Sequence, residues 1–170
     1  MRRLLLAICL TCPPAPAVAD ADALGLALTA LARGQLEVAA EAYEALDDPI
    51  ARDIVEWRRL RRGGAEFEDY VDFLERNPDW PGLPYLRARG EPSIPRGADP
   101  DRVIAYFGDQ PPRTGMGALA LAEAYEAKGD TENAHRIAVD AWTGLTMSGD
   151  AAGALRSGFS DLLNEGDYHL

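Results

Sequence analysis

The feature that most constrains the fold is a pair of short helix-forming segments, bounded by glycine and proline, between residues 47 and 82. Asp47 or Asp48 can cap backbone N–H groups, and Pro49 suits the first position of a helix. Four apolar residues then recur at helical spacing and predict a buried face: Ile50, Ile54, Trp57 and Leu60. A Gly-Gly pair at residues 63 and 64 is expected to end this helix.

The second segment of the pair is predicted to be a helix from Phe67 to Arg76. Its apolar residues fall on one side of such a helix: Phe67, Tyr70, Val71 and Leu74. The following Asn-Pro-Asp-Trp-Pro-Gly run must break the chain, because neither Pro78 nor Pro81 can sit inside a continuing helix.

These residues resemble a known family. The run ARDIVEWRRLR (51–61), the aromatic-rich helix after it and RNPDWPG (76–82) are similar to the N-terminal α-superhelix of soluble lytic murein transglycosylases. The similarity continues through DPDRVIAYFGDQPPRTGMGALALAEAY (99–125) and covers nearly all of the chain after residue 20. The resemblance implies a periplasmic protein whose parent enzyme cleaves the MurNAc–GlcNAc bond of peptidoglycan. It also implies that this part shapes the glycan-strand cavity and supports a catalytic domain.

That catalytic domain is absent from the sequence, and no catalytic residue is predicted. The family uses one glutamic acid in a Glu-Ser motif, near a Gly-Leu-Met-Gln segment, and neither motif occurs here. The acidic residues between positions 37 and 48 are interpreted as solvated helix faces and caps: Glu37, Glu41, Glu44, Asp47 and Asp48. His135 and His169 have no partner ligands at metal-binding spacing, and phosphate and dinucleotide motifs are missing, so neither a metal nor a cofactor is predicted.

Among the aromatic residues, Trp80 is the weak candidate for a substrate contact. Trp57 and Trp142 fall on apolar helix stripes, where core packing is the favoured interpretation. Trp80 lies in a turn between Pro78 and Pro81, where it could either staple two helical hairpins or contact glycan.

Five arginines form a local basic strip: Arg52, Arg58, Arg59, Arg61 and Arg62. Pairing with Glu56, Glu66 and Glu68 is the favoured interpretation, and docking of peptide-stem carboxylates is the alternative. The chain as a whole carries a formal net charge of −11, which disfavours nucleic acid as a partner.

Residues 1–19 are predicted to be a secretory signal peptide. Arg2 and Arg3 form a basic start, an apolar run follows to Cys12, and Ala17-Val18-Ala19 provides small residues for cleavage. The run is too short for a membrane anchor, and Ile8 and Thr11 before the two cysteines disfavour a lipoprotein. Removal of this segment would take the net charge from −11 to −13 and remove both cysteines.

The remainder of the chain predicts further helix pairs. Two helices are expected between Asp22 and Leu46, and the Gly34-Gln35-Leu36 break between them returns ninety-five residues later as Gly129-Asp130-Thr131. The later copy has tetratricopeptide-like spacing of small and large residues. Further helices are expected after Pro81, after Asp99, over 114–128, over 131–145 and over 148–163.

The sequence therefore predicts an all-α domain over residues 20–170, arranged as a right-handed superhelix of short antiparallel hairpins. No polar capping helix is recognisable after residue 166, so the domain is expected to be incomplete, either as a fragment or as a truncated gene product. Besides the transglycosylase scaffold, the alternative function is a stand-alone periplasmic tetratricopeptide-like adaptor that binds a protein partner.

Overall fold

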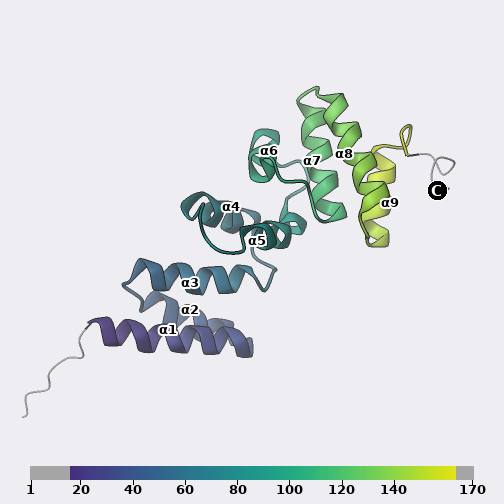
Figure 1. The fold of residues 1–170 in the computed structure, drawn as a ribbon. Coiled ribbons are helices and arrows are strands. Elements are labelled where there is room, and N and C mark those ends of the chain that lie inside the picture. Colours follow the sequence, from purple (N-terminus) through teal and green to yellow (C-terminus); the bar gives the residue numbers. More distant parts are fainter. Residues whose placement is uncertain (1–15, 164–170) are drawn as a thin grey trace, which may run out of the picture. The chain divides into compact units, whose positions relative to one another are not determined.

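The computed structural model describes residues 16–163, and its regular structure in this range consists only of helices (Figure 1). Nine α-helices and one short 3-10 helix lie in the described part, and no strand does. The prediction of an all-α fold is confirmed. The chain divides into two compact units, Met1–Arg58 and Arg59–Leu170, which are described separately below.

The first unit contains α1 (Pro16–Arg33), α2 (Leu36–Glu44) and most of α3 (Pro49–Leu60). Its core is built largely from alanine, which lets the helices approach closely. The buried residues of this core are Ala27, Ala30, Leu31, Ala39, Ala42, Leu46, Ala51 and Val55. The predicted start of α3 is confirmed, because the backbone N–H of Ile50 donates to the carboxylate of Asp48 at 2.9 Å and Pro49 is the first helical residue.

The buried face of this unit differs from the predicted one. Ile50 was expected on a buried face, yet this residue is 62% exposed, and the large apolar residues Leu26 and Leu36 are 52% and 61% exposed. Ala27 and Ala51, each next in sequence to one of these large residues, occupy the core instead. Side chains of neighbouring helical residues point about 100° apart. When the alanines of a helix face the core, the adjacent large side chain is therefore turned toward solvent.

The repeated glycine break has the same local structure in both copies. Gly34 and Gly129 have φ of +75° and +77°, a conformation that favours glycine. The residue after each glycine donates its N–H to the carbonyl five positions earlier, Gln35 to Ala30 and Asp130 to Tyr125, at 2.9 Å in both cases. The next helix begins two residues after each glycine, so the predicted repeat is confirmed at the level of this turn.

The second unit holds α4 (Phe67–Arg76), α5 (Leu83–Gly90), the 3-10 helix η1 (Glu91–Ser93) and α6 (Pro100–Phe107). Buried rings join α4 to α6. Phe67 of α4 and Tyr106 of α6 meet edge to face with ring centroids 5.0 Å apart. Within α6, Tyr106 also meets its neighbour Phe107 edge to face, with centroids 5.3 Å apart. The predicted apolar face of α4 is buried as expected, and the bounds of α4 are those predicted.

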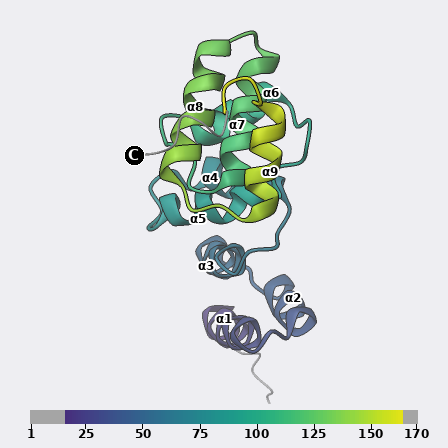
Figure 2. The ribbon, with the colours of Figure 1, turned by 90° about the vertical axis from the view of Figure 1, so that its right-hand side faces the viewer.

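The second unit continues with α7 (Gly115–Ala127), α8 (Thr131–Gly144) and α9 (Gly149–Gly158). The α7–α8 pair runs side by side in two views of the ribbon, and α9 packs against α7 (Figure 2). The last helix was predicted to reach Leu163, but it ends at Gly158. Phe159 leaves helical geometry, and its buried ring meets His135 edge to face at 6.4 Å.

The acidic face of α4 is bound by an arginine of α6. The guanidinium of Arg102 pairs with Glu68, with Glu75 at 3.1 Å and with Asp72 at 3.8 Å. The pKa of Arg102 is raised, first by its hydrogen bond to Glu68. Glu68 was expected to pair with the arginines after residue 50, and its partner on α6 corrects that prediction. The long connector between α5 and α6 makes this pairing hard to foresee from sequence.

The glycine turn before α8 gives a test of the fold. We expect Gly129→Ala to lower the free energy of unfolding by about 1 kcal/mol, because an L-residue is strained at positive φ. A Cβ at this position meets no atom within 4 Å, so the cost comes from the backbone alone. The measurement is urea denaturation followed by circular dichroism.

Gly153→Ala is the matched control. This glycine lies inside α9, and a Cβ there also meets no atom within 4 Å. We expect it to raise the free energy of unfolding by about 0.5–1 kcal/mol. Equal effects of the two substitutions would contradict the assignment of the Gly129 turn.

Candidate functional site

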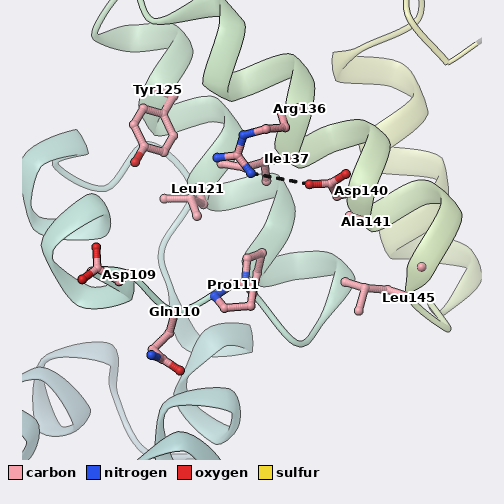
Figure 3. A pocket seen from close by; sticks show the side chains of 13 residues that line it. Asp109, Gln110, Pro111, Leu121, Tyr125, Arg136, Ile137, Asp140, Ala141 and Leu145 are labelled. Carbon is pink, nitrogen blue, oxygen red and sulfur yellow. Dashed lines mark hydrogen bonds and ion pairs between the residues drawn. The ribbon is translucent and has the colours of Figure 1, made fainter.

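A surface groove of about 520 Å³ lies in the second unit, between α7, α8 and the segment 108–112 that precedes α7 (Figure 3). Its volume falls within the range of about 300–1,000 Å³ that is usual for ligand sites. The floor is apolar and comes from the facing stripes of the two helices. Leu121 of α7 and Ile137 and Ala141 of α8 are buried there.

Polar groups surround this floor. Asp109 and Gln110 lie on the loop side and Asp140 on α8, and all three are exposed. Figure 3 shows Tyr125 of α7 at one end of the groove, with Arg136 of α8 beside it. An apolar floor can bury an apolar group of a ligand. Polar groups at the edge can then fix the orientation of the rest of that ligand.

The arginine at the groove is compensated by its own helix. Arg136 pairs with Asp140 at 3.5 Å and donates to the side-chain oxygen of Asn133 at 3.0 Å. Asn133 in turn donates to Asp130, the N-cap of α8, and these hydrogen bonds lower the pKa of the Asp130 carboxyl. The charge of Arg136 is thus balanced within one face of α8.

The loop wall of the groove is stiff. The last helical residue of α6 is Phe107, and Gly108 follows with φ of +53°. The N–H of Gln110 donates back to the carbonyl of Phe107 at 3.0 Å. Pro111 and Pro112 then fix the backbone direction, since the proline ring locks φ.

The end of this loop is held by a buried carboxylate. Glu91 in η1 is only 2% exposed, and it accepts hydrogen bonds from the backbone N–H groups of Arg113 (2.9 and 3.0 Å) and Thr114 (2.7 Å). The hydroxyl of Thr114 also donates to it at 2.7 Å. The same hydroxyl accepts from the N–H of Gly117 and caps α7. The N-terminus of the helix and these hydrogen bonds offset part of the cost of burying a negative charge here.

Close packing excludes water from the Glu91 carboxylate. A Cβ on Gly117 would lie inside the contact distance of this carboxylate, so glycine is required at that position. Burial raises the pKa of Glu91, although the hydrogen bonds from Thr114 and Arg113 partly oppose the rise. Burial, and then the Glu91 charge, raises the pKa of Tyr106 as well. Neither residue is exposed, so the pair serves the fold rather than chemistry on a substrate.

Trp80, the weak substrate candidate from the sequence, lies outside the groove. Its ring is partly buried and meets the buried ring of Phe73 edge to face, with centroids 5.7 Å apart. The backbone N–H of Trp80 donates to the backbone carbonyl of Asn77 at 3.1 Å and closes the turn. The ring of Trp80 therefore packs against α4. Trp57 and Trp142, assigned to the core, are only partly buried.

Residues of the arginine strip make contacts within the protein. In the first unit, Arg52 donates to the carbonyl of Leu46 at 2.7 Å and lies over the ring of Tyr43. In the second unit, Arg59 pairs with Asp69 at 3.1 Å. Arg61 lies 4.6 Å from the ring centroid of Tyr85, as in a cation–π contact.

The sequence matches no family model, and no curated protein or solved structure matches it either.

Two further properties concern the described residues alone. In residues 16–163, histidine and the acidic residues form no group of three that could hold a metal ion. His135 is exposed on α8, and His169 lies outside the described residues. None of the helices in this range is both long and apolar enough to cross a membrane. Most of the predicted signal peptide, residues 1–15, also lies outside the described part.

Sequence reasoning missed both the groove and Glu91. The groove combines the segment 108–112, for which the sequence predicts no function, with residues of α7 and α8. Glu91 lies in a proline-rich segment for which the sequence predicts no role. Its signal in the sequence is weak: an acidic residue directly before Pro92, between two segments with apolar helical spacing.

We expect Glu91→Ala to lower the free energy of unfolding by about 3 kcal/mol, because it leaves two partly buried N–H groups and a hydroxyl without their acceptor. Glu91→Gln keeps one oxygen for Thr114 and should cost about 1 kcal/mol. Glu132→Ala, an exposed site in the first turn of α8, is the control and should change stability by less than about 0.5 kcal/mol. Chemical denaturation measures all three, and equal costs for Ala at 91 and 132 would contradict the buried anchor.

The raised pKa of Glu91 predicts a pH dependence. The folded protein holds the Glu91 proton to a higher pH than the unfolded chain does. Its contribution to stability is therefore fully present below the unfolded value near 4.5 and is lost as pH rises through the folded pKa. We expect the stability of the wild type minus that of Glu91→Gln to fall as the pH rises above about 4.5. A difference that rises with pH would show that the hydrogen bonds outweigh the burial.

Proposed function

We propose that the chain is the non-catalytic helical scaffold of a periplasmic protein like the lytic transglycosylases, shaping the space that holds a peptidoglycan strand. The observation that carries this proposal is the run of family-like residues from Asp48 to Gly82, continued over 99–125. The helical architecture supports it, because superhelical proteins are built from short helices joined by repeated turns.

The cell-wall role places the chemistry elsewhere. The sequence contains no Glu-Ser motif, and its acidic residues between positions 37 and 48 include helix-face and capping residues that are exposed. In this proposal the scaffold binds or encloses the glycan strand, and a separate lysozyme-like domain cleaves the MurNAc–GlcNAc bond. Neither a cofactor nor a metal takes part in the role of this chain.

Export is part of the same proposal. Residues 1–19 have the basic start, apolar run and small-residue site of a signal peptide. Cleavage after Ala19 would yield a periplasmic chain that begins at Asp20. The intact mass of the exported protein tests this directly, and a mass that retains residues 1–19 would contradict it.

The scaffold proposal predicts binding to the cell wall without cleavage. We expect the purified chain to co-sediment with peptidoglycan sacculi at physiological salt and to release no anhydro-muropeptides. Sacculi digested to soluble fragments serve as the control for retention. A chain that stays in the supernatant, or that releases anhydro-muropeptides on its own, would contradict the proposal.

The weak candidate Trp80 is tested in the same assay. Trp80→Leu keeps apolar contact with Phe73 but removes the ring, so retention should fall if this ring touches glycan. Trp142→Leu is the matched control, since Trp142 is also partly buried and lies on α8.

A second function is favoured by the groove on α7 and α8. A helical hairpin with an apolar floor and a polar edge suits a periplasmic, tetratricopeptide-like adaptor that binds a protein partner. Failure of sacculus binding together with specific capture of a polypeptide would favour this function over the scaffold.

A further inference from the structure

We propose that the groove between segment 108–112, α7 and α8 binds a short extended peptide segment of another protein, in which aliphatic side chains alternate with lysine or arginine. This inference does not rest on the cell-wall proposal. Sacculus binding and peptide binding are separate measurements, and either can fail without the other.

The floor of the groove determines the apolar part of the ligand. Leu121, Ile137 and Ala141 line the floor from two helices, and the partly buried Leu145 lines it just after the end of α8 (Figure 3). These are aliphatic side chains of moderate size. A leucine-sized side chain placed on them would release water from both partners, which is the main driving force for such contacts.

The charges at the edge select a cationic neighbour. Asp109 and Asp140 both border the groove, whereas Arg136 is already paired with Asp140 and bonded to Asn133. Because Arg136 and Asp140 balance each other, the unbalanced charge of the lining is the exposed carboxylate of Asp109, in a chain with a net charge of −11. Such a surface attracts a basic segment and repels an acidic one.

The loop wall also offers acceptors rather than donors. Pro111 and Pro112 have no N–H group. In the part of the chain that the structure describes, the carbonyl oxygens of residues 109–112 accept no hydrogen bond. An extended peptide brings a row of N–H donors, and lysine or arginine adds more, so its hydrogen-bonding groups complement this wall.

A glycan fits the same groove less well. A neutral oligosaccharide gains nothing from an excess of carboxylates. Of the residues that line the groove, Tyr125 alone is aromatic, whereas sugars are bound by stacking on exposed rings. A basic and aliphatic peptide uses the floor, the charges and the carbonyl groups together.

The probe is an acetylated, amidated octapeptide of alternating leucine and lysine. Two peptides of the same length are controls, one of leucine and glutamate and one of serine and lysine. Binding to the full chain is measured by amide chemical-shift changes in ¹H–¹⁵N spectra at two salt concentrations. We expect the leucine–lysine peptide to bind with a Kd below about 1 mM, more weakly at high salt, and to shift the amides of residues 109, 110, 121, 125, 137 and 145.

Two exposed or partly exposed positions test the contributions separately. Asp109→Asn should weaken binding of the leucine–lysine peptide about two- to five-fold, since an exposed ion pair contributes little more. Leu145→Ser should weaken it by about ten-fold through lost apolar contact. Their matched controls lie outside the groove, Asp79→Asn in the turn after α4 and Leu36→Ser in the first unit, and should leave Kd unchanged.

Three results would overturn the proposal. The first is shift changes at the exposed Leu26, Leu36 and Ile50 in place of the groove residues, which would show general adhesion to apolar surface. The second is equal affinity for the leucine–glutamate peptide. The third is a chitin hexasaccharide that perturbs the groove amides while the leucine–lysine peptide does not, which would assign the groove to glycan.

Discussion

The second unit depends on one buried carboxylate that serves as the acceptor for a helix start. Glu91 lies 22 and 23 residues before the two amides that it binds, so its hydrogen bonds close a long loop that contains the connector and α6. Backbone N–H groups and the Thr114 hydroxyl take the place of water around this buried carboxylate. This arrangement costs less than burying an unpaired charge, because three donors are already oriented toward the oxygen atoms.

The hydrogen bonds of Glu91 help to fix the shape of the groove. Residues 113 and 114 are fixed by Glu91, residue 110 is tied back to the end of α6, and two prolines span the interval between them. The loop wall is therefore held at both ends while its side chains stay exposed. The floor has a different origin, since it follows from the packing of α7 on α8. The groove thus forms where a rigid loop crosses the α7–α8 hairpin. The loop supplies exposed polar groups, and the hydrogen bonds of Glu91 hold the end of the loop in place.

The sequence predicted the helices well where their ends carry strong local signals. Pro49 with Asp48 marked the start of α3, and glycine at 34 and 129 marked helix ends, because these residues act through their own backbone geometry. The buried faces of α1 to α3 were harder to predict, because alanine is found both in cores and on surfaces. Here alanines fill the core, and Leu26 and Ile50 point toward solvent. Glu91 and the groove could not be predicted, because both depend on segments brought together only by the tertiary fold.

Glu91 also has a consequence for motion. The amide protons of Arg113 and Thr114 lie outside any helix, where exchange with solvent is ordinarily fast, yet both are bound to an oxygen that water does not reach. They can exchange only when η1 withdraws from the start of α7. Their exchange rates therefore measure how often this junction opens, independently of unfolding of the helices on either side.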